Sequence, residues 1–134
     1  MENALRWQTL QAQISSLRAV SEAAHAAPQL GSRDQSILHV WCAIEGLFPK
    51  VSTEVSFRVA LYLAQLIKAD DRLAYHRRVK KAYDLRSRLA HGSRRDTTHD
   101  EWLDAWGLLM DAINALLVRG ALPDDDELLG ELLK

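Results

Sequence analysis

Apolar residues recur every three or four positions along most of this 134-residue chain, and this spacing constrains the fold more than any other feature. The pattern is clearest where one helix face would carry Trp102, Trp106, Leu109, Ile113 and Leu116. No segment shows the strict apolar–polar alternation that is typical of a half-buried strand. The sequence therefore predicts an all-α fold.

Start and stop signals divide this pattern into separate helices. Apolar faces run over residues 10–24, 37–48, 55–67, 73–89 and 102–116, and a short acidic helix is expected over residues 124–133. Ser32 or Asp34 can cap the second helix, and Ser52 or Thr53 the third. Thr98 opens a capping box before the helix with the two tryptophans. Because the loops are short, we expect an antiparallel bundle of four to five helices with a short terminal one.

The composition is that of an ordinary globular domain, with 48% hydrophobic and 26% charged residues. We expect one domain over residues 1–134, which can stand alone or belong to a longer protein. No signal peptide is evident, and no apolar run approaches the roughly 20 residues that cross a bilayer. These features predict a cytoplasmic protein without a membrane partner. Cys42, the only cysteine, lies among apolar residues and is expected to be a small buried side chain.

Charge is distributed unevenly along the chain. Residues 72–95 hold nine of the seventeen Lys and Arg residues and one acid, whereas residues 96–131 hold ten acids and one base. This asymmetry suits either a positive face for an anionic partner or complementarity between helices or protomers. The candidates for contact with an RNA backbone are Arg77, Arg78, Lys80, Lys81, Arg88, Arg94 and Arg95. The simpler interpretation of the same residues is a solvated helix face.

Residues 83–92, Tyr-Asp-Leu-Arg-Ser-Arg-Leu-Ala-His-Gly, place an arginine and a histidine in the most basic part of the chain. RNA carries its own nucleophile, the 2′-OH, so cleavage requires proton transfer and stabilisation of a charged transition state. A histidine such as His91 suits the first task near neutral pH, and the fixed charge of Arg86 suits the second. This pair therefore predicts phosphodiester cleavage without a metal, giving a 2′,3′-cyclic phosphate and a 5′-OH.

Helix geometry limits how these two residues can cooperate. Five positions on an ideal helix place Arg86 and His91 about 140° apart. Either the helix ends near His91, as Gly92 permits, or two protomers contribute to one site. The local alternative is structural, because a glycine commonly follows a helix and a cation in the last turn is favoured by the helix dipole.

The motif resembles the Arg-x(4–6)-His signature of the HEPN superfamily, and in particular of its Apea-like group. Two upstream stretches are similar to helices of the same group. They are residues 39–48, which carry a hydrophobic-x-x-Glu-x-Leu pattern, and residues 56–64. The resemblance is strongest over residues 35–118 and implies a HEPN-like helical domain.

The resemblance also implies a homodimer whose two motifs meet in a composite cleft. Many family members are metal-independent endoribonucleases of toxin–antitoxin, abortive-infection and CRISPR-associated defence systems. Carried onto this chain, Arg86 and His91 would be the catalytic pair, and Glu45 would orient Arg86. Tyr83 leads the motif. Ser87 follows the arginine, where many active relatives have Asn, Asp or His.

The implied partners are RNA, a second copy of the chain, and an antitoxin or sensor domain. No cofactor is implied, and no Cys-x-x-Cys, His-x-x-x-His or carboxylate cluster has the spacing of metal ligands. The alternative function is a non-catalytic HEPN module that binds RNA or a partner protein through the same basic helix. A third is a dimerisation or regulatory domain in which the face carrying Trp102 and Trp106 matters most.

Overall fold

The computed structural model describes residues 4–5, 15–48, 51–120 and 125–133. Over these residues the chain is all-helical and contains no strand, which confirms the predicted helical bundle. Its elements are α2 (Ser15–Ala26), the 3₁₀ turn η1 (Ala27–Gln29), α3 (Arg33–Glu45), α4 (Val55–Ile67), α5 (Arg72–Ala90), α6 (His99–Arg119) and α7 (Asp125–Leu132).

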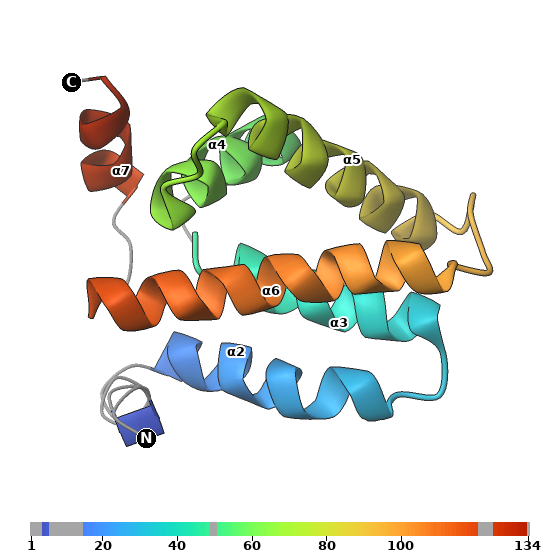
Figure 1. Cartoon of the computed structure of the whole chain (residues 1–134). Coiled ribbons are helices and arrows are strands. Elements are labelled where there is room, and N and C mark those ends of the chain that lie inside the picture. Colours follow the sequence, from blue (N-terminus) through green and yellow to red (C-terminus); the bar gives the residue numbers. More distant parts are fainter. Residues whose placement is uncertain (1–3, 6–14, 49–50, 121–124, 134) are drawn as a thin grey trace.

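The longest helix, α6, runs along the bundle with α3 and α2 on one side and the α4–α5 pair on the other (Figure 1). Successive helices α2 and α3 run in opposite directions, and so do α5 and α6, as short loops predict (Figure 1). As a result α3 and α6 begin at the same end of the bundle, where α5 finishes. The short helix α7 packs against α4 near the opposite end.

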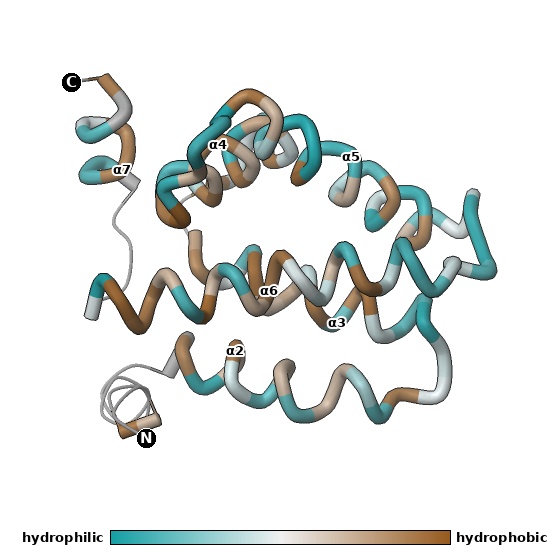
Figure 2. The backbone as a smooth tube through the Cα atoms, viewed as in Figure 1, coloured by the Kyte–Doolittle hydropathy of each residue, from teal (hydrophilic) through white to brown (hydrophobic). Residues whose placement is uncertain are grey.

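The core lies where these helices meet, and apolar segments recur along each of them (Figure 2). The largest fully buried side chains are Leu17, Val20, Ile37, Trp41, Ile44, Leu47, Phe48, Leu63, Leu108, Leu109, Leu116 and Leu128. Each side chain of this size stabilises the folded state by about 1.5–3 kcal/mol when it leaves water. Among the described helices, none combines the length and the apolar character that a membrane crossing needs.

Side-chain caps begin three helices, and two of these caps, Ser32 and Thr98, were predicted. The Ser32 hydroxyl accepts a hydrogen bond from the backbone N–H of Gln35 at 3.0 Å, so Ser32 rather than Asp34 caps α3. Asp71 caps α5 in the same way. Thr98 and Glu101 form the complete capping box at the start of α6. Side-chain oxygens thus satisfy backbone donors that a helix start would otherwise leave unpaired.

The prediction of a Ser52 or Thr53 cap for α4 was wrong. The residue before this helix is Glu54, which adopts a left-handed backbone with a φ of 50° and makes no capping hydrogen bond through its side chain. The preceding helix also ends earlier than expected, at Glu45, with Gly46 as its C-terminal cap. Part of the first predicted helix, residues 10–14, lies outside the described residues.

Two residues expected to be buried are exposed. Leu73 is 60% exposed, because it lies six positions and about 120° around α5 from the fully buried Val79. Cys42 is also exposed, three positions after the exposed His39 on the solvent-facing stripe of α3. Apolar neighbours in the sequence therefore did not indicate the side of the helix on which Cys42 lies.

Candidate functional site

The candidate site lies on the last turns of α5. The helix continues through the motif to Ala90, and His91 caps it with a nearly helical backbone, donating its N–H to the Ser87 carbonyl at 3.0 Å. Gly92 then adopts a φ of +73°, a left-handed conformation that glycine tolerates best. A side chain at this position would meet no neighbour within 4 Å, so the backbone conformation and not space requires glycine.

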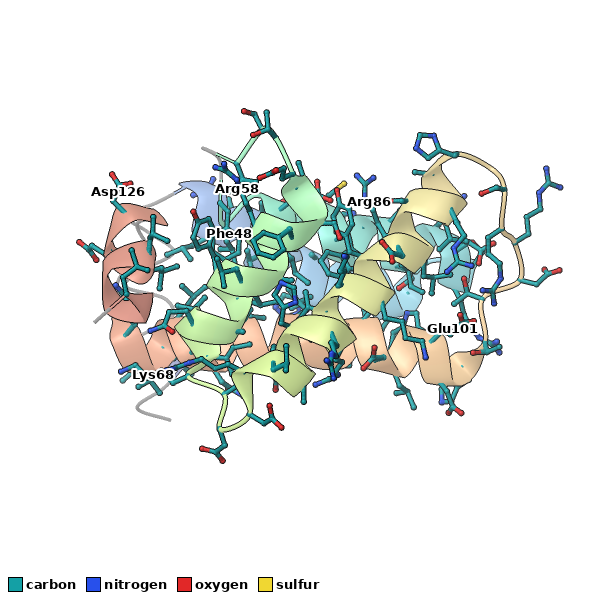
Figure 3. The ribbon with its side chains drawn as sticks, turned by 90° about the horizontal axis from the view of Figure 1, so that it is seen from above. Phe48, Arg58, Lys68, Arg86, Glu101 and Asp126 are labelled. Carbon is teal, nitrogen blue, oxygen red and sulfur yellow. The ribbon has the colours of Figure 1, made fainter. Side chains whose placement is uncertain are left out.

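Arg86 is anchored to α3. Its Nε lies 3.1 Å from Oε1 of Glu45, and the two side chains are 24% and 27% exposed. The guanidinium carbon lies 5.6 Å from the centre of the Tyr83 ring, within the range of a cation–π contact. Trp41 in turn packs edge-on against Tyr83, with ring centres 5.3 Å apart. Figure 3 shows Arg86 on α5, and these contacts fix its side chain against α3.

The ion pair with Glu45 engages only part of the Arg86 guanidinium. The Nε–H of Arg86 is not directed at Oε1 of Glu45, so the contact is an ion pair rather than a hydrogen bond. No hydrogen bond within the described residues engages the terminal nitrogens of Arg86. Burial raises the pKa of Tyr83, and the negative charge of Glu45 raises it further against the opposing effect of Arg86. The cluster thus positions a guanidinium whose terminal nitrogens keep their capacity to bind an anion.

His91 is exposed, and no side-chain hydrogen bond or ion pair holds it within the described part of the chain. Because α5 is continuous up to Ala90, His91 and Arg86 lie about 140° apart around the helix and about 7.5 Å apart along it. The helix does end at His91, but its helical backbone does not turn the imidazole toward Arg86. One chain therefore presents the two motif side chains on different sides of α5. Ser87, half-buried, contributes its carbonyl to the helix end.

The basic residues fall into two groups. Arg78 pairs with Asp104 at 2.6 Å and with Asp111 at 3.8 Å, and Arg94 pairs with Glu101 at 2.7 Å. For these two arginines, pairing with acidic residues of α6 accounts for the charge. The remaining candidates are exposed and make no ion pair within the described residues; they are Arg77, Lys80, Lys81, Arg88 and Arg95.

Helix geometry aligns several of these free charges with His91. At about 100° per residue, the positions of four residues share one sector of about 80° around α5: Arg77, Lys81, Arg88 and His91. We call these four residues the solvent stripe of α5. Asp84 lies in the same sector and lowers its net positive charge. The solvent stripe therefore combines an unpartnered imidazole with three cations on one exposed surface.

A groove of about 490 Å³ separates α5 from α6. Its walls carry opposite charges, with Arg78, Lys81 and Arg88 on α5 and Asp100, Glu101 and Asp104 on α6. A polyanion entering this groove would meet the carboxylates of α6 as well as the cations of α5. The interior of the groove is thus poorly suited to an RNA backbone, although Lys81 and Arg88 of the solvent stripe also line it.

The loop that follows the motif is fixed by Asp34. The carboxylate accepts hydrogen bonds from the backbone N–H of Thr97 at 2.9 Å, from the Thr97 hydroxyl, and from the N–H of Asp96 at 3.2 Å. Arg33 donates to the Thr97 carbonyl at 2.9 Å. We call these contacts the Asp34–Thr97 clasp. The hydrogen bonds from Thr97 lower the pKa of Asp34. Sequence reasoning identified Asp34 only as a helix cap and missed this role.

No protein-family model, curated protein or solved structure matches this chain. Within the described residues, no group of three or more His, Cys, Asp or Glu side chains is arranged to hold a metal ion. The HEPN assignment accordingly stays a prediction from the motif and its flanking helices.

Proposed function

We propose that this protein is a metal-independent endoribonuclease of the HEPN type, cleaving single-stranded or looped RNA in a toxin–antitoxin or phage-defence setting. The observation that carries the proposal is the anchoring of Arg86. The family resemblance implies that Glu45 orients this arginine, and the two side chains form an ion pair at 3.1 Å. An arginine held in this way, with terminal nitrogens free of hydrogen bonds, is suited to bind a phosphate in a defined orientation.

The proposed reaction uses the 2′-OH of the substrate as nucleophile. The neutral imidazole of His91 accepts the 2′-OH proton as the oxygen attacks the adjacent phosphorus. The P–O5′ bond then breaks, the leaving 5′ oxygen takes a proton from water, and a 2′,3′-cyclic phosphate remains. Arg86 stabilises the charge that develops on the non-bridging oxygens. His91, exposed to solvent, releases its proton before the next turnover.

The positions of the two residues support a composite site. Because one chain presents Arg86 and His91 about 140° apart on α5, a second protomer is needed to bring a histidine to the arginine. A two-fold homodimer would form two equivalent sites, each with Arg86 from one protomer and His91 from the other. An antitoxin or sensor domain that covers either Arg86 or His91 on both protomers would silence both sites.

A second candidate function is a non-catalytic module that binds RNA or a partner protein. The solvent stripe favours it, because its three cations form no ion pair within the described residues and remain available for phosphates. Such a protein would show an RNA affinity that falls steeply with salt, without any cleavage.

The first experiment is cleavage of a labelled single-stranded RNA in excess EDTA. We expect wild-type protein to give cyclic-phosphate ends, His91→Ala to give none, and His39→Ala, an exposed histidine on α3, to match wild type. Thermal melting would check that both variants remain folded. Full activity of His91→Ala would contradict the proposal, and binding without cleavage would favour the second candidate.

Mixing two inactive variants tests the composite site directly. A heterodimer of Arg86→Ala and His91→Ala contains one site with both residues intact and one site with neither. With random exchange, half of the dimers are mixed, so we expect about a quarter of wild-type activity. No recovery after subunit exchange would argue that both residues act within one chain.

A further inference from the structure

Three aromatic rings form a stack along the first two turns of α6. The His99 and Trp102 rings are nearly parallel, with 6.3 Å between their centres and 15° between their planes. Trp102 and Trp106 continue the stack at 5.6 Å and 9°. Spacings of three and four residues place all three rings on one helix face. We call this set the aromatic ladder.

The ladder is held in place by two successive hydrogen bonds, the first of which is donated by its middle ring. Nε1 of Trp102 donates to the Ser36 hydroxyl at 2.7 Å, and that hydroxyl donates to the Ala27 carbonyl at 2.7 Å. Ser36 is buried, so the indole orientation is fixed from within the bundle. His99, whose imidazole makes no hydrogen bond or ion pair within the described residues, is aligned by stacking on a fixed ring.

One end of the ladder is open. Because α6 begins at His99, no earlier turn of the helix provides a ring to cover it, and the His99 side chain is exposed. His99 also lines a hollow of about 490 Å³, formed by residues 31–34 and 96–99. The Asp34–Thr97 clasp ties the two walls of this hollow together. The open end of the stack therefore adjoins a preformed, polar-walled space.

We propose that this hollow binds one base of an RNA strand, stacked on His99 as the fourth ring of the ladder. A nucleobase combines a flat aromatic face for the imidazole with polar edges for the walls. The identification of the ligand as an RNA base, rather than a different aromatic molecule, rests on the proposed function. His99 follows His91 by eight residues, at the end of the bundle where α5 finishes and α6 begins (Figure 1). A base seated there positions the strand at the end of the protein that carries His91.

The test uses oligonucleotides that the proposed reaction cannot cleave. A short fluorescein-labelled oligodeoxyadenylate has bases but no 2′-OH, and an abasic strand of the same length has phosphates but no bases. Binding would be followed by fluorescence anisotropy at low salt. The proteins would be wild type, His99→Ala, His99→Phe and the control His39→Ala, each checked by thermal melting.

We expect wild type to bind the adenylate about tenfold more tightly than the abasic strand, because stacking of a single base has about that effect. His99→Ala should lose this preference, whereas His99→Phe and His39→Ala should keep it. Equal affinity of wild type for the two strands, an unchanged preference in His99→Ala, or no binding of the adenylate would overturn the inference. The cleavage assay with His91→Ala reports on the proposed function separately, so either idea can fail alone.

Discussion

Removing the carboxylate from Glu45 should destabilise the protein and release Arg86. Both side chains are about three-quarters buried, at 24% and 27% exposure, and the charged atoms lie 3.1 Å apart. Exposed ion pairs contribute about 0–1 kcal/mol, while breaking a fully buried pair costs about 3–5 kcal/mol. The partial burial of this pair places the expected loss for Glu45→Ala between these limits, at about 2 kcal/mol.

A double-mutant cycle isolates the interaction from the loss of packing. Urea unfolding of Glu45→Ala, Arg86→Ala and the double variant should give a coupling energy of about 1–2 kcal/mol. The matched control is the exposed pair Glu54–Arg58, whose atoms are 3.7 Å apart and whose side chains are 72% and 44% exposed. Its coupling should stay below about 0.5 kcal/mol.

Replacing Glu45 with glutamine has a spectroscopic consequence. Because the charge of Glu45 helps to raise the pKa of Tyr83, Glu45→Gln should lower that pKa in an ultraviolet titration. RNA cleavage by Glu45→Gln should also decrease, because Arg86 loses the partner that orients it. A coupling energy no larger than that of the Glu54–Arg58 control, together with an unchanged tyrosine titration, would refute the view that Glu45 positions Arg86.

Three further predictions concern the core, the clasp and the basic surface. Leu108→Ala should cost about 3 kcal/mol in urea unfolding, because Leu108 is fully buried, whereas Leu103→Ala, at a residue 45% exposed, should cost less than about 1 kcal/mol. The pKa of Asp34 is lowered by the hydrogen bonds from Thr97, so its contribution to stability is present above the unfolded-state pKa and is lost as the pH falls through the folded-state pKa; Asp34→Asn should flatten this acid limb. Arg77→Ala should weaken RNA binding and reduce the salt slope by about one, whereas Arg78→Ala should mainly lower the melting temperature.

The helical periodicity was sufficient to predict the fold class, because each buried face repeats at the spacing of a helix. The capping signals at Ser32 and Thr98 also gave correct helix starts, since a cap depends on neighbours within one turn. The start of α4 was missed for the opposite reason. Glu54 adopts a left-handed backbone without a capping side chain, and no local sequence signal marks it.

The site was harder to predict because it depends on how the helices are rotated against one another. Arg77 and Arg78 are adjacent in the basic run, yet a rotation of about 100° leaves Arg77 in water and brings Arg78 against Asp104 of α6. The contact between Glu45 and Arg86 was implied by the family resemblance alone, since 41 positions separate them in the sequence. Composition could not distinguish paired from free charges.

The Asp34–Thr97 clasp has a consequence for how this end of the protein forms and opens. Its hydrogen bonds join residues 63 positions apart, so the loop after α5 cannot reach its final shape until α3 has docked. Contacts across so long a stretch of chain form late in folding, after local helices are already present. In the native protein, the amides of Asp96 and Thr97 should exchange with solvent deuterium only when the clasp opens. The clasp thereby restrains the surface loop that joins α5 to α6.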